Sequence, residues 1–265
     1  MLEHVTASRV ALLGGVYGND LALEAVLADA AARGAEMVYC LGDVGGFGPD
    51  PDGAIRRLRE SDVRCVQGNY DVAVAQALAD CGCGYSDPRD NAFARISYAF
   101  TLAHTGSAHR RWLGALPPLR RVVLGRWRVL LAHGSPRQIN EFLWETTTPN
   151  GLLDAFCRDW DADVLAVTHT GLKWHRALPS GRHAINVGAV GRPENDGSPR
   201  VWYTLLTAAP DLEVQFVPVA YDHETVAREM EHAGLPAEFS ETIRTGWWTC
   251  CLEAMPVKER ARGRY

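Results

Sequence analysis

The chain has 265 residues, of which 47% are hydrophobic and 22% are charged, and its formal net charge is −5. These values are typical of one globular domain, or one domain with an appendage, that buries a sizeable core. They argue against duplex nucleic acid as a partner, and no apolar run approaches the roughly 20 residues that cross a bilayer. Residues 1–6 lack the charged and apolar regions of a signal peptide, so we expect a cytoplasmic protein.

The first part of the chain alternates short apolar runs with helical patterns. Strands are predicted at 10–13, 36–41 and 63–67, and helices at 20–33, 53–60 and 71–79. An irregular loop rich in Cys, Gly and Asp follows at 80–90. The alternation predicts parallel strands that are joined by right-handed crossovers.

The second part is predicted to contain more strands than helices. Helices are expected at 91–102, 107–113, 138–143, 151–159, 222–233 and 238–244. Strands are expected at 119–124, 127–132, 164–167, 174–178, 183–187, 201–207 and 212–218. We therefore expect a single domain over 1–245, followed by a tail over 246–265 that packs on the body or is partly disordered.

Four of the apolar runs are followed by a potential metal ligand. These residues are Asp43, Asn69, His133 and His169. The functional crevice of an α/β sheet lies at the carboxyl ends of its strands, so we expect the four side chains to converge. Two imidazoles, a carboxylate and an amide oxygen suit Mn, Fe or Zn. The alternative is a metal-free pocket in which these polar groups hydrogen-bond with one another.

The order and spacing of five motifs resemble those of the calcineurin-like metallophosphoesterases, especially the small bacterial ones, from about Arg9 to about Leu206. The motifs are Leu41-Gly42-Asp43 with Gly48-Pro49-Asp50-Pro51 behind it, Gly68-Asn69-Tyr70-Asp71, His133-Gly134-Ser135-Pro136-Arg137, Thr168-His169-Thr170, and Asn186-Val187-Gly188-Ala189-Val190-Gly191. The resemblance implies an α/β fold with the four layers α/β/β/α, and hydrolysis of phosphate esters at a metal site. It also implies that Asp43 is shared by two metals and that Asn69, His133 and His169 complete one of them.

The chain departs from the family at the other metal. The family's Asp-x-His pair is replaced by Gly15 and Tyr17. Its catalytic His is Tyr70 in this chain, and the second His of its last motif is Gly171. We therefore expect one divalent transition metal, Mn, Fe or Zn, and no complete site for a second. The two tyrosines either donate hydrogen bonds to the substrate or fill the space that the missing metal leaves.

Other side chains are predicted to act on the substrate. Tyr70 and Asp71 are the candidate catalytic residues, since a phenol can donate a hydrogen bond to a phosphate or an alkoxide. Asn19, Arg137 and Arg192 are predicted to contact the substrate, and the two guanidinium groups can grip an anion with two hydrogen bonds.

The chain has seven cysteines, and in a reducing compartment we expect no disulfides. Cys81-Gly82-Cys83 follows the helix predicted at 71–79. Cys81 and Cys83 are candidates for extra ligands that rebuild the lost metal position; the alternative is a reduced loop without a role. Trp247-Trp248 and Cys250-Cys251 are predicted to pack the tail onto the body.

The sequence thus predicts a metal-dependent hydrolase of phosphomonoesters or phosphodiesters with a mononuclear site. One alternative is a weak or inactive protein of the same fold that binds a phosphate-containing ligand or partner. Another keeps the scaffold and uses Cys81 and Cys83 in a different chemistry. The expected partner is a small phosphate-containing molecule, and neither a membrane nor duplex nucleic acid is expected. The oligomeric state is not predicted.

Overall fold

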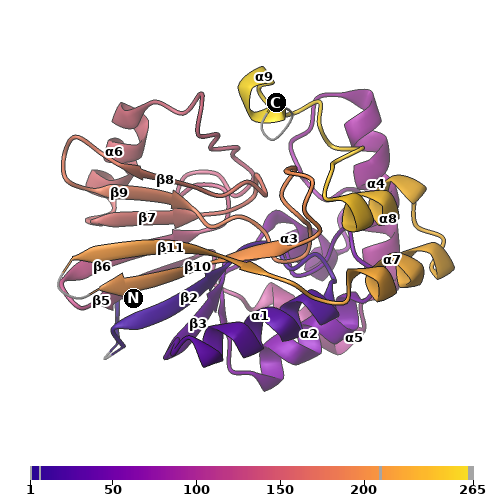
Figure 1. The fold of residues 1–265 in the computed structure, drawn as a ribbon, viewed down its shortest axis with the longest axis horizontal. Coiled ribbons are helices and arrows are strands. Elements are labelled where there is room, and N and C mark those ends of the chain that lie inside the picture. Colours follow the sequence, from indigo (N-terminus) through magenta and orange to yellow (C-terminus); the bar gives the residue numbers. More distant parts are fainter. Residues whose placement is uncertain (1, 6, 209–210, 262–265) are drawn as a thin grey trace.

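Two mixed β-sheets packed face to face form the centre of the protein (Figure 1). The computed structural model describes residues 2–5, 7–208 and 211–261. The end of the predicted tail, 262–265, lies outside the described residues. Within the described part of the chain, no helix combines the length and apolar content that crossing a bilayer requires.

The five-stranded sheet contains the parallel strands that the sequence predicts in the first part of the chain. Its strands are, in spatial order, β11 (Leu212–Val219), β10 (Val201–Ala208), β2 (Arg9–Leu13), β3 (Met37–Cys40) and β4 (Arg64–Cys65). β2, β3 and β4 are parallel, and β10 runs antiparallel to both of its neighbours.

The six-stranded sheet is formed by the middle of the chain and one strand near the N-terminus. Its strands are, in spatial order, β1 (Leu2–Val5), β5 (Leu119–Leu124), β6 (Trp127–Ala132), β7 (Val164–Val167), β9 (His183–Asn186) and β8 (Trp174–Ala177). β5 and β6 form the predicted hairpin, and β6, β7 and β9 are parallel. The carboxyl ends of these parallel strands therefore meet at one edge of the sheet.

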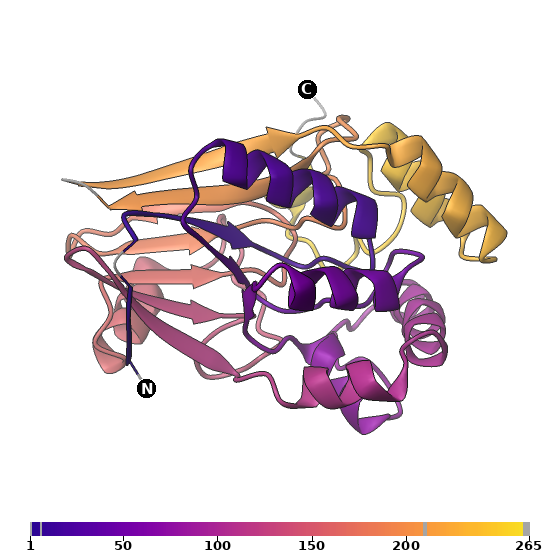
Figure 2. The ribbon, with the colours of Figure 1, turned by 90° about the horizontal axis from the view of Figure 1, so that it is seen from below.

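Helices cover the outer faces of both sheets. Those that pack on the five-stranded sheet include α1 (Asp20–Ala32), α2 (Pro51–Glu60), α3 (Asn69–Gln76) and α5 (Ser107–Gly114). Figure 2 shows α1 and α2 side by side on this face. α6 (Asn150–Asp159) packs on the six-stranded sheet. At one end lie α4 (Pro88–Ala103), α7 (His223–His232), α8 (Ala237–Thr245) and α9 (Val257–Arg260).

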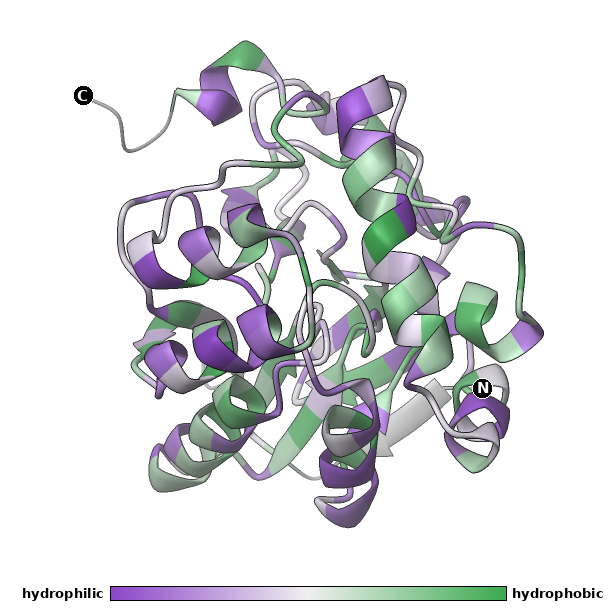
Figure 3. Ribbon diagram, turned by 90° about the vertical axis from the view of Figure 1, so that its right-hand side faces the viewer, coloured by the Kyte–Doolittle hydropathy of each residue, from purple (hydrophilic) through white to green (hydrophobic). Residues whose placement is uncertain are grey.

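Side-chain alternation in the strands explains the four layers. In β2, Ala11 and Leu13 point to the helices, whereas Val10 and Leu12 point to the other sheet. Each buried leucine stabilises the fold by about 1.5–3 kcal/mol. Several outer helices, among them α2, α6 and α7, are apolar mainly on one side, and purple and green segments alternate along the helices in Figure 3. The predicted four-layer α/β/β/α fold is confirmed.

Three local predictions differ from the structure. The helix predicted at 138–143 is absent, because the carbonyl of Gln138 turns back to accept from the backbone N–H of Ser135 (3.0 Å) and so is not used in an α-helical hydrogen bond further along the chain. β4 is shorter than predicted. β1 and α9, each of four residues, were not predicted, since such short segments carry little periodic signal.

The C-terminal segment 246–261 crosses the end of the molecule beside α4 and α8 (Figure 1). The Trp248 indole N–H donates to the carbonyl of Pro193 (2.7 Å), and the Trp248 backbone N–H donates to Asn195 (2.8 Å). Further along, the N–H of Ala254 donates to the buried carboxylate of Asp90 (3.0 Å). These contacts hold the segment against the body, where it forms one wall of the pocket described below.

Candidate metal centre

Three polar side chains, one after a strand of the five-stranded sheet and two after strands of the six-stranded sheet, meet in the interior. Asp43 follows β3, His133 follows β6 and His169 follows β7. One potential ligand atom of each lies within 4.8 Å of those of the other two, and all three side chains are buried. The convergence arises because parallel strands end at the same edge of the structure.

His133 is oriented by a backbone hydrogen bond. Its Nδ1 lies 2.7 Å from the carbonyl oxygen of Leu41. A nitrogen that donates to a carbonyl leaves the other nitrogen of the neutral ring as an acceptor. That other nitrogen, Nε2, lies 3.2 Å from Oδ2 of Asp43 and 3.0 Å from Nδ1 of His169. His133 therefore presents a lone pair to the centre of the cluster.

Burial and the opposite charges within the cluster set the protonation of its members. Burial opposes the charged forms of Asp43 and His133, but their mutual attraction outweighs it, so the pKa of Asp43 is lowered and that of His133 is raised. Burial, with repulsion from His133, lowers the pKa of His169 to about 3. At neutral pH the cluster thus holds a carboxylate and at least one neutral imidazole, the forms that bind metals.

Two buried atoms here have no hydrogen-bond partner among the described residues. They are Oδ1 of Asn69 and Nε2 of His169. Leaving such a group unsatisfied costs about 1–3 kcal/mol. Asn69 is adjacent to Tyr70, whose backbone N–H donates to Asp43 (3.0 Å). The donor set and these unsatisfied atoms fit a single metal ion with mixed N/O ligands.

Asp71 connects the two loops that carry Asp43 and Asn69. It is completely buried and accepts hydrogen bonds from the backbone N–H groups of Asp43 (2.9 Å), Val44 (3.0 Å) and Gly68 (2.8 Å). Burial, with repulsion from Asp43, raises its pKa to about 7, against the effect of the N–H donors. Asp71 thus holds together the segments that carry Asp43 and Asn69, and its catalytic role stays a prediction.

The backbone is strained at two of the clustered residues. Asp43 has φ 56° and His169 has φ 66°, the left-handed region that residues with a Cβ rarely adopt. Such conformations cost of order 1–3 kcal/mol and persist only where the surroundings enforce them. They turn both side chains into the cluster.

Aromatic rings occupy the other side of the pocket, where this chain lacks the metal ligands that the resemblance implies. A Cβ on Gly15 would lie 2.4 Å from the Tyr17 ring, and one on Gly171 would lie 3.2 Å from the Trp248 ring. Tyr70 is buried, and its hydroxyl lies 3.4 Å from the carbonyl of Ala94. Burial raises the pKa of both phenols well above the usual range, so they stay protonated at neutral pH. The geometry favours a space-filling role for Tyr17.

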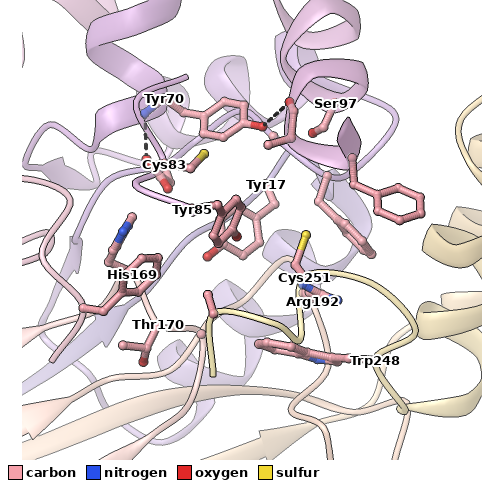
Figure 4. A pocket seen from close by; sticks show the side chains of 18 of the residues that line it. Tyr17, Tyr70, Cys83, Tyr85, Ser97, His169, Thr170, Arg192, Trp248 and Cys251 are labelled. Carbon is pink, nitrogen blue, oxygen red and sulfur yellow. Dashed lines mark hydrogen bonds between the residues drawn. The ribbon is translucent and has the colours of Figure 1, made fainter. Parts of the chain in front are cut away.

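A pocket of about 70 Å³ lies between the two sides (Figure 4). Asp43 and His169 line one part of it, and most of the remaining wall is aromatic, including Tyr85 and Phe142. One water molecule needs about 10–15 Å³ on this measure, so the pocket has room for several waters or for a small ligand group.

Of the three residues predicted to contact the substrate, Arg192 reaches the pocket. It is 7% exposed, and its guanidinium lies between the rings of Phe47 (4.8 Å) and Trp248 (3.8 Å). One nitrogen donates to the carbonyl of Cys250 (2.8 Å), while Nε has no hydrogen-bond partner and no carboxylate among the described residues pairs with it. Such a buried cation is suited to an anionic ligand.

Asn19 and Arg137 have other partners. Asn19 caps α1 by accepting from the N–H of Ala22 (3.1 Å), and its amide nitrogen donates to the carbonyl of Gly191 (3.2 Å). Arg137 lies at the surface, paired with Glu141. Neither side chain lines this pocket, and their contact with the substrate stays a prediction. Residue type identified these side chains, but it could not show that local partners engage them.

Cys81 and Cys83 form a disulfide, which corrects the expectation of reduced thiols and of thiolate ligands. Their Cα atoms are 5.4 Å apart, within the range that a disulfide spans. Cys83 still lines the pocket. The odd number of cysteines gave no signal for this pairing.

Residues of the tail that line the pocket were not predicted to do so. Trp248 and Cys251 face it in Figure 4. A hydrogen bond with Cys250 and the charge of Arg192 lower the pKa of Cys251 to about 7, against the effect of burial. The clustered Trp and Cys residues indicated that the tail would be buried, but not where.

Known proteins with similar sequences or structures include phosphoesterases and proteins without an assigned function. No protein-family model matches the chain. An uncharacterized protein of Methanocaldococcus jannaschii is 25% identical over 253 residues, which cover 90% of this chain and 98% of that protein. The crystal structure of a metallophosphoesterase from Sphaerobacter thermophilus is similar, with 29% identity, a TM-score of 0.69, and coverage of 91% of this chain and 100% of that one. A hypothetical protein from Pyrococcus horikoshii has 23% identity, a TM-score of 0.74, and coverage of 93% and 99%.

Proposed function

We propose that this chain, which belongs to the calcineurin-like phosphoesterase superfamily, hydrolyses a phosphomonoester or phosphodiester with the help of one bound metal ion. The buried cluster of Asp43, His133 and His169 is the observation that carries the proposal. A buried carboxylate beside two imidazoles, one of which has a ring nitrogen without a partner among the described residues, is suited to a shared metal ion.

One divalent ion, Mn, Fe or Zn, would be held by Asp43, Asn69, His133 and His169. When bound, it supplies the Lewis acidity that polarises a phosphoryl oxygen. The other side of the pocket has little to offer a second ion, because Gly15 and Gly171 carry no ligand atoms in their side chains.

The protein's own residues bind and orient the ester. Arg192 has an unpartnered Nε and attracts the negative charge of the phosphate. The protonated Tyr70 can donate a hydrogen bond to an ester oxygen, and the aromatic walls exclude water. A phenol with a raised pKa is a weak general acid at neutral pH, so the expected turnover is low.

A second candidate is a protein that binds a phosphate-containing ligand without hydrolysing it. The observation that favours it is the lining of the pocket, in which the Tyr17 ring and Trp248 of the tail stand against Gly15 and Gly171, where the resemblance implies groups that bind metal. Both candidates predict a ligand that carries phosphate. Only turnover therefore distinguishes them.

The test is reconstitution of metal-free protein with Mn²⁺, Fe²⁺ or Zn²⁺, one at a time, and assay against a panel of phosphate monoesters and diesters. We expect about one ion per chain and a turnover below about 10 s⁻¹, the median of enzymes. His169→Ala should abolish both metal binding and hydrolysis, and the exposed His175→Ala serves as the matched control. Metal binding with ligand binding but no hydrolysis would support the second candidate, and absence of metal binding would refute the first.

A further inference from the structure

The loop 80–84 separates the pocket from the outside of the molecule. Cys83 lines the inner pocket together with Asp43 and His169. Cys81 and Gly82 line a depression on the other side of the loop, which Asn69 also borders. The disulfide therefore lies in the wall between the metal cluster and a surface from which a small thiol can approach.

The loop holds the side chain of Asn69. The amide nitrogen Nδ2 donates to the carbonyl of Cys81 (2.8 Å) and lies 3.7 Å from Sγ of Cys83. Because an amide is planar, fixing Nδ2 also fixes the direction of Oδ1. Oδ1 is the buried atom that has no hydrogen-bond partner among the described residues. Both half-cystines thus contribute to the orientation of one candidate metal ligand.

The loop is otherwise restrained by the packing of Cys81 and Cys83 in the core and by a hydrogen bond from the Gly82 N–H to Asp80 (2.7 Å). Gly82 and Gly84 both have positive φ (61° and 83°), and no helix or strand includes residues 80–84. Asn140, which is partly exposed, donates to the carbonyl of Gly82 (2.8 Å) from outside. Once the disulfide opens, the two glycines leave the loop free to change conformation.

We propose that the Cys81–Cys83 disulfide is a redox-modifiable site that positions Asn69, so that its reduction weakens the binding of Mn²⁺ at the cluster. The inference rests on the proposed metal site but not on hydrolysis. Disulfides of proteins in reducing compartments are mostly catalytic or redox-sensing, which agrees with this role.

The reaction is thiol–disulfide exchange with a dithiol. One thiolate of the dithiol attacks Sγ of Cys81, the half-cystine that borders the outer depression, and Cys83 leaves as a thiolate. The second thiol of the dithiol then attacks the mixed disulfide and releases Cys81. Two electrons and two protons pass to the protein, which gains two thiols, and the dithiol becomes a disulfide.

The expected effect follows from the loss of a second-sphere contact. Partners that orient metal ligands typically change metal affinity by about 10- to 100-fold when they are removed. Mn²⁺ is the appropriate probe, because it favours oxygen ligands such as the Asn69 amide and has little preference for a freed thiolate. We expect the reduced protein to bind Mn²⁺ at least about tenfold more weakly than the oxidised protein.

The experiment compares full-length, metal-free protein in its oxidised and reduced forms, with the dithiol removed under nitrogen, by calorimetric titration with Mn²⁺. Thiol counting by alkylation and mass spectrometry verifies each form. Cys81→Ser/Cys83→Ser should behave as the reduced form in both conditions. The buried Cys157→Ser, at α6, is the matched control and should retain the difference between the two forms.

Asn69→Asp tests the path through the amide, because it keeps an oxygen ligand and lacks the N–H donor. In this variant the two redox forms should bind Mn²⁺ equally, and Asn69→Ala provides the same test if Asn69→Asp does not fold. Equal affinities of the two forms of the unchanged chain, tighter binding by the reduced form, a difference that persists in Asn69→Asp, or failure of the disulfide to form under oxidising conditions would each overturn the inference. A chain that binds no Mn²⁺ in either form would refute the metal site itself.

Discussion

The two sides of the pocket differ in how they fill their space. On one side, Asp43, His133 and His169 form a buried polar cluster in which a nitrogen remains without a partner. On the other, two glycines stand against the rings of Tyr17 and Trp248. The side that lacks the ligands of the family is packed with aromatic side chains, so it is a completed apolar wall and not an eroded metal site. This difference between the two sides agrees with the proposed site for a single ion.

The largest effect should come from removing a ligand on the polar side. His169→Ala is expected to abolish stabilisation by Mn²⁺, which for the unchanged protein is about 4 kcal/mol at a metal concentration 1,000 times the dissociation constant. Urea unfolding with and without Mn²⁺ measures this difference, with His175→Ala as the control. If Mn²⁺ stabilised the variant as much as the unchanged protein, His169 would not be a ligand.

Asp71 should matter even without metal. Asp71→Ala removes the acceptor of three buried N–H groups, each of which costs about 1–3 kcal/mol when unsatisfied, so a loss of at least about 3 kcal/mol is expected. Unfolding of the metal-free protein measures it, and Asp71→Asn, which keeps an acceptor oxygen, should lose less. The exposed Asp211→Ala is the control. A loss that appeared only with metal present would contradict the positioning role.

The aromatic side can be tested through the contact between Gly15 and Tyr17. Gly15→Ala should cost about 1–3 kcal/mol, because the new methyl group would overlap the Tyr17 ring. In a Tyr17→Ala background the same change should cost less, which gives a coupling energy of about 1–2 kcal/mol in a double-mutant cycle. Additive costs would show that the ring is not what excludes a side chain at this position.

The smallest effect concerns pH. The pKa of His133 is raised by Asp43, so protons compete with the metal at a higher pH than they do for a free imidazole. Affinity for Mn²⁺ should therefore fall as the pH falls through this pKa, by up to about 1.4 kcal/mol per pH unit for one displaced proton. His169, with a pKa of about 3, should not contribute near neutrality. Titrations between about pH 5 and about pH 8 measure the slope, and an affinity independent of pH would contradict the model of a buried imidazole ligand.

The fold and the polar cluster were predictable for the same physical reason. Apolar periodicity identifies parallel strands, and the residues that follow such strands meet at one edge, which brought His133 and His169 together. Apolar periodicity does not show which side chains contact one another. It could not show that Arg137 pairs with Glu141, nor that Trp248 from the tail packs against Gly171, which lies 77 residues earlier in the sequence. The disulfide was not predicted for a similar reason. Two cysteines separated by one residue form a disulfide only if the loop between them has the required turn.

The left-handed backbone at Asp43 and His169 has opposite consequences for stability and for metal binding. At such positions glycine relieves a strain of about 1–2 kcal/mol, and this benefit is present whether or not a metal is bound. The benefit of the ligand side chain exists only when metal is available. Where metal is scarce, or the reaction is no longer needed, replacement of His169 by glycine would stabilise the fold. The same replacement would remove a candidate metal ligand. The side chains present at both positions agree with the proposed metal site.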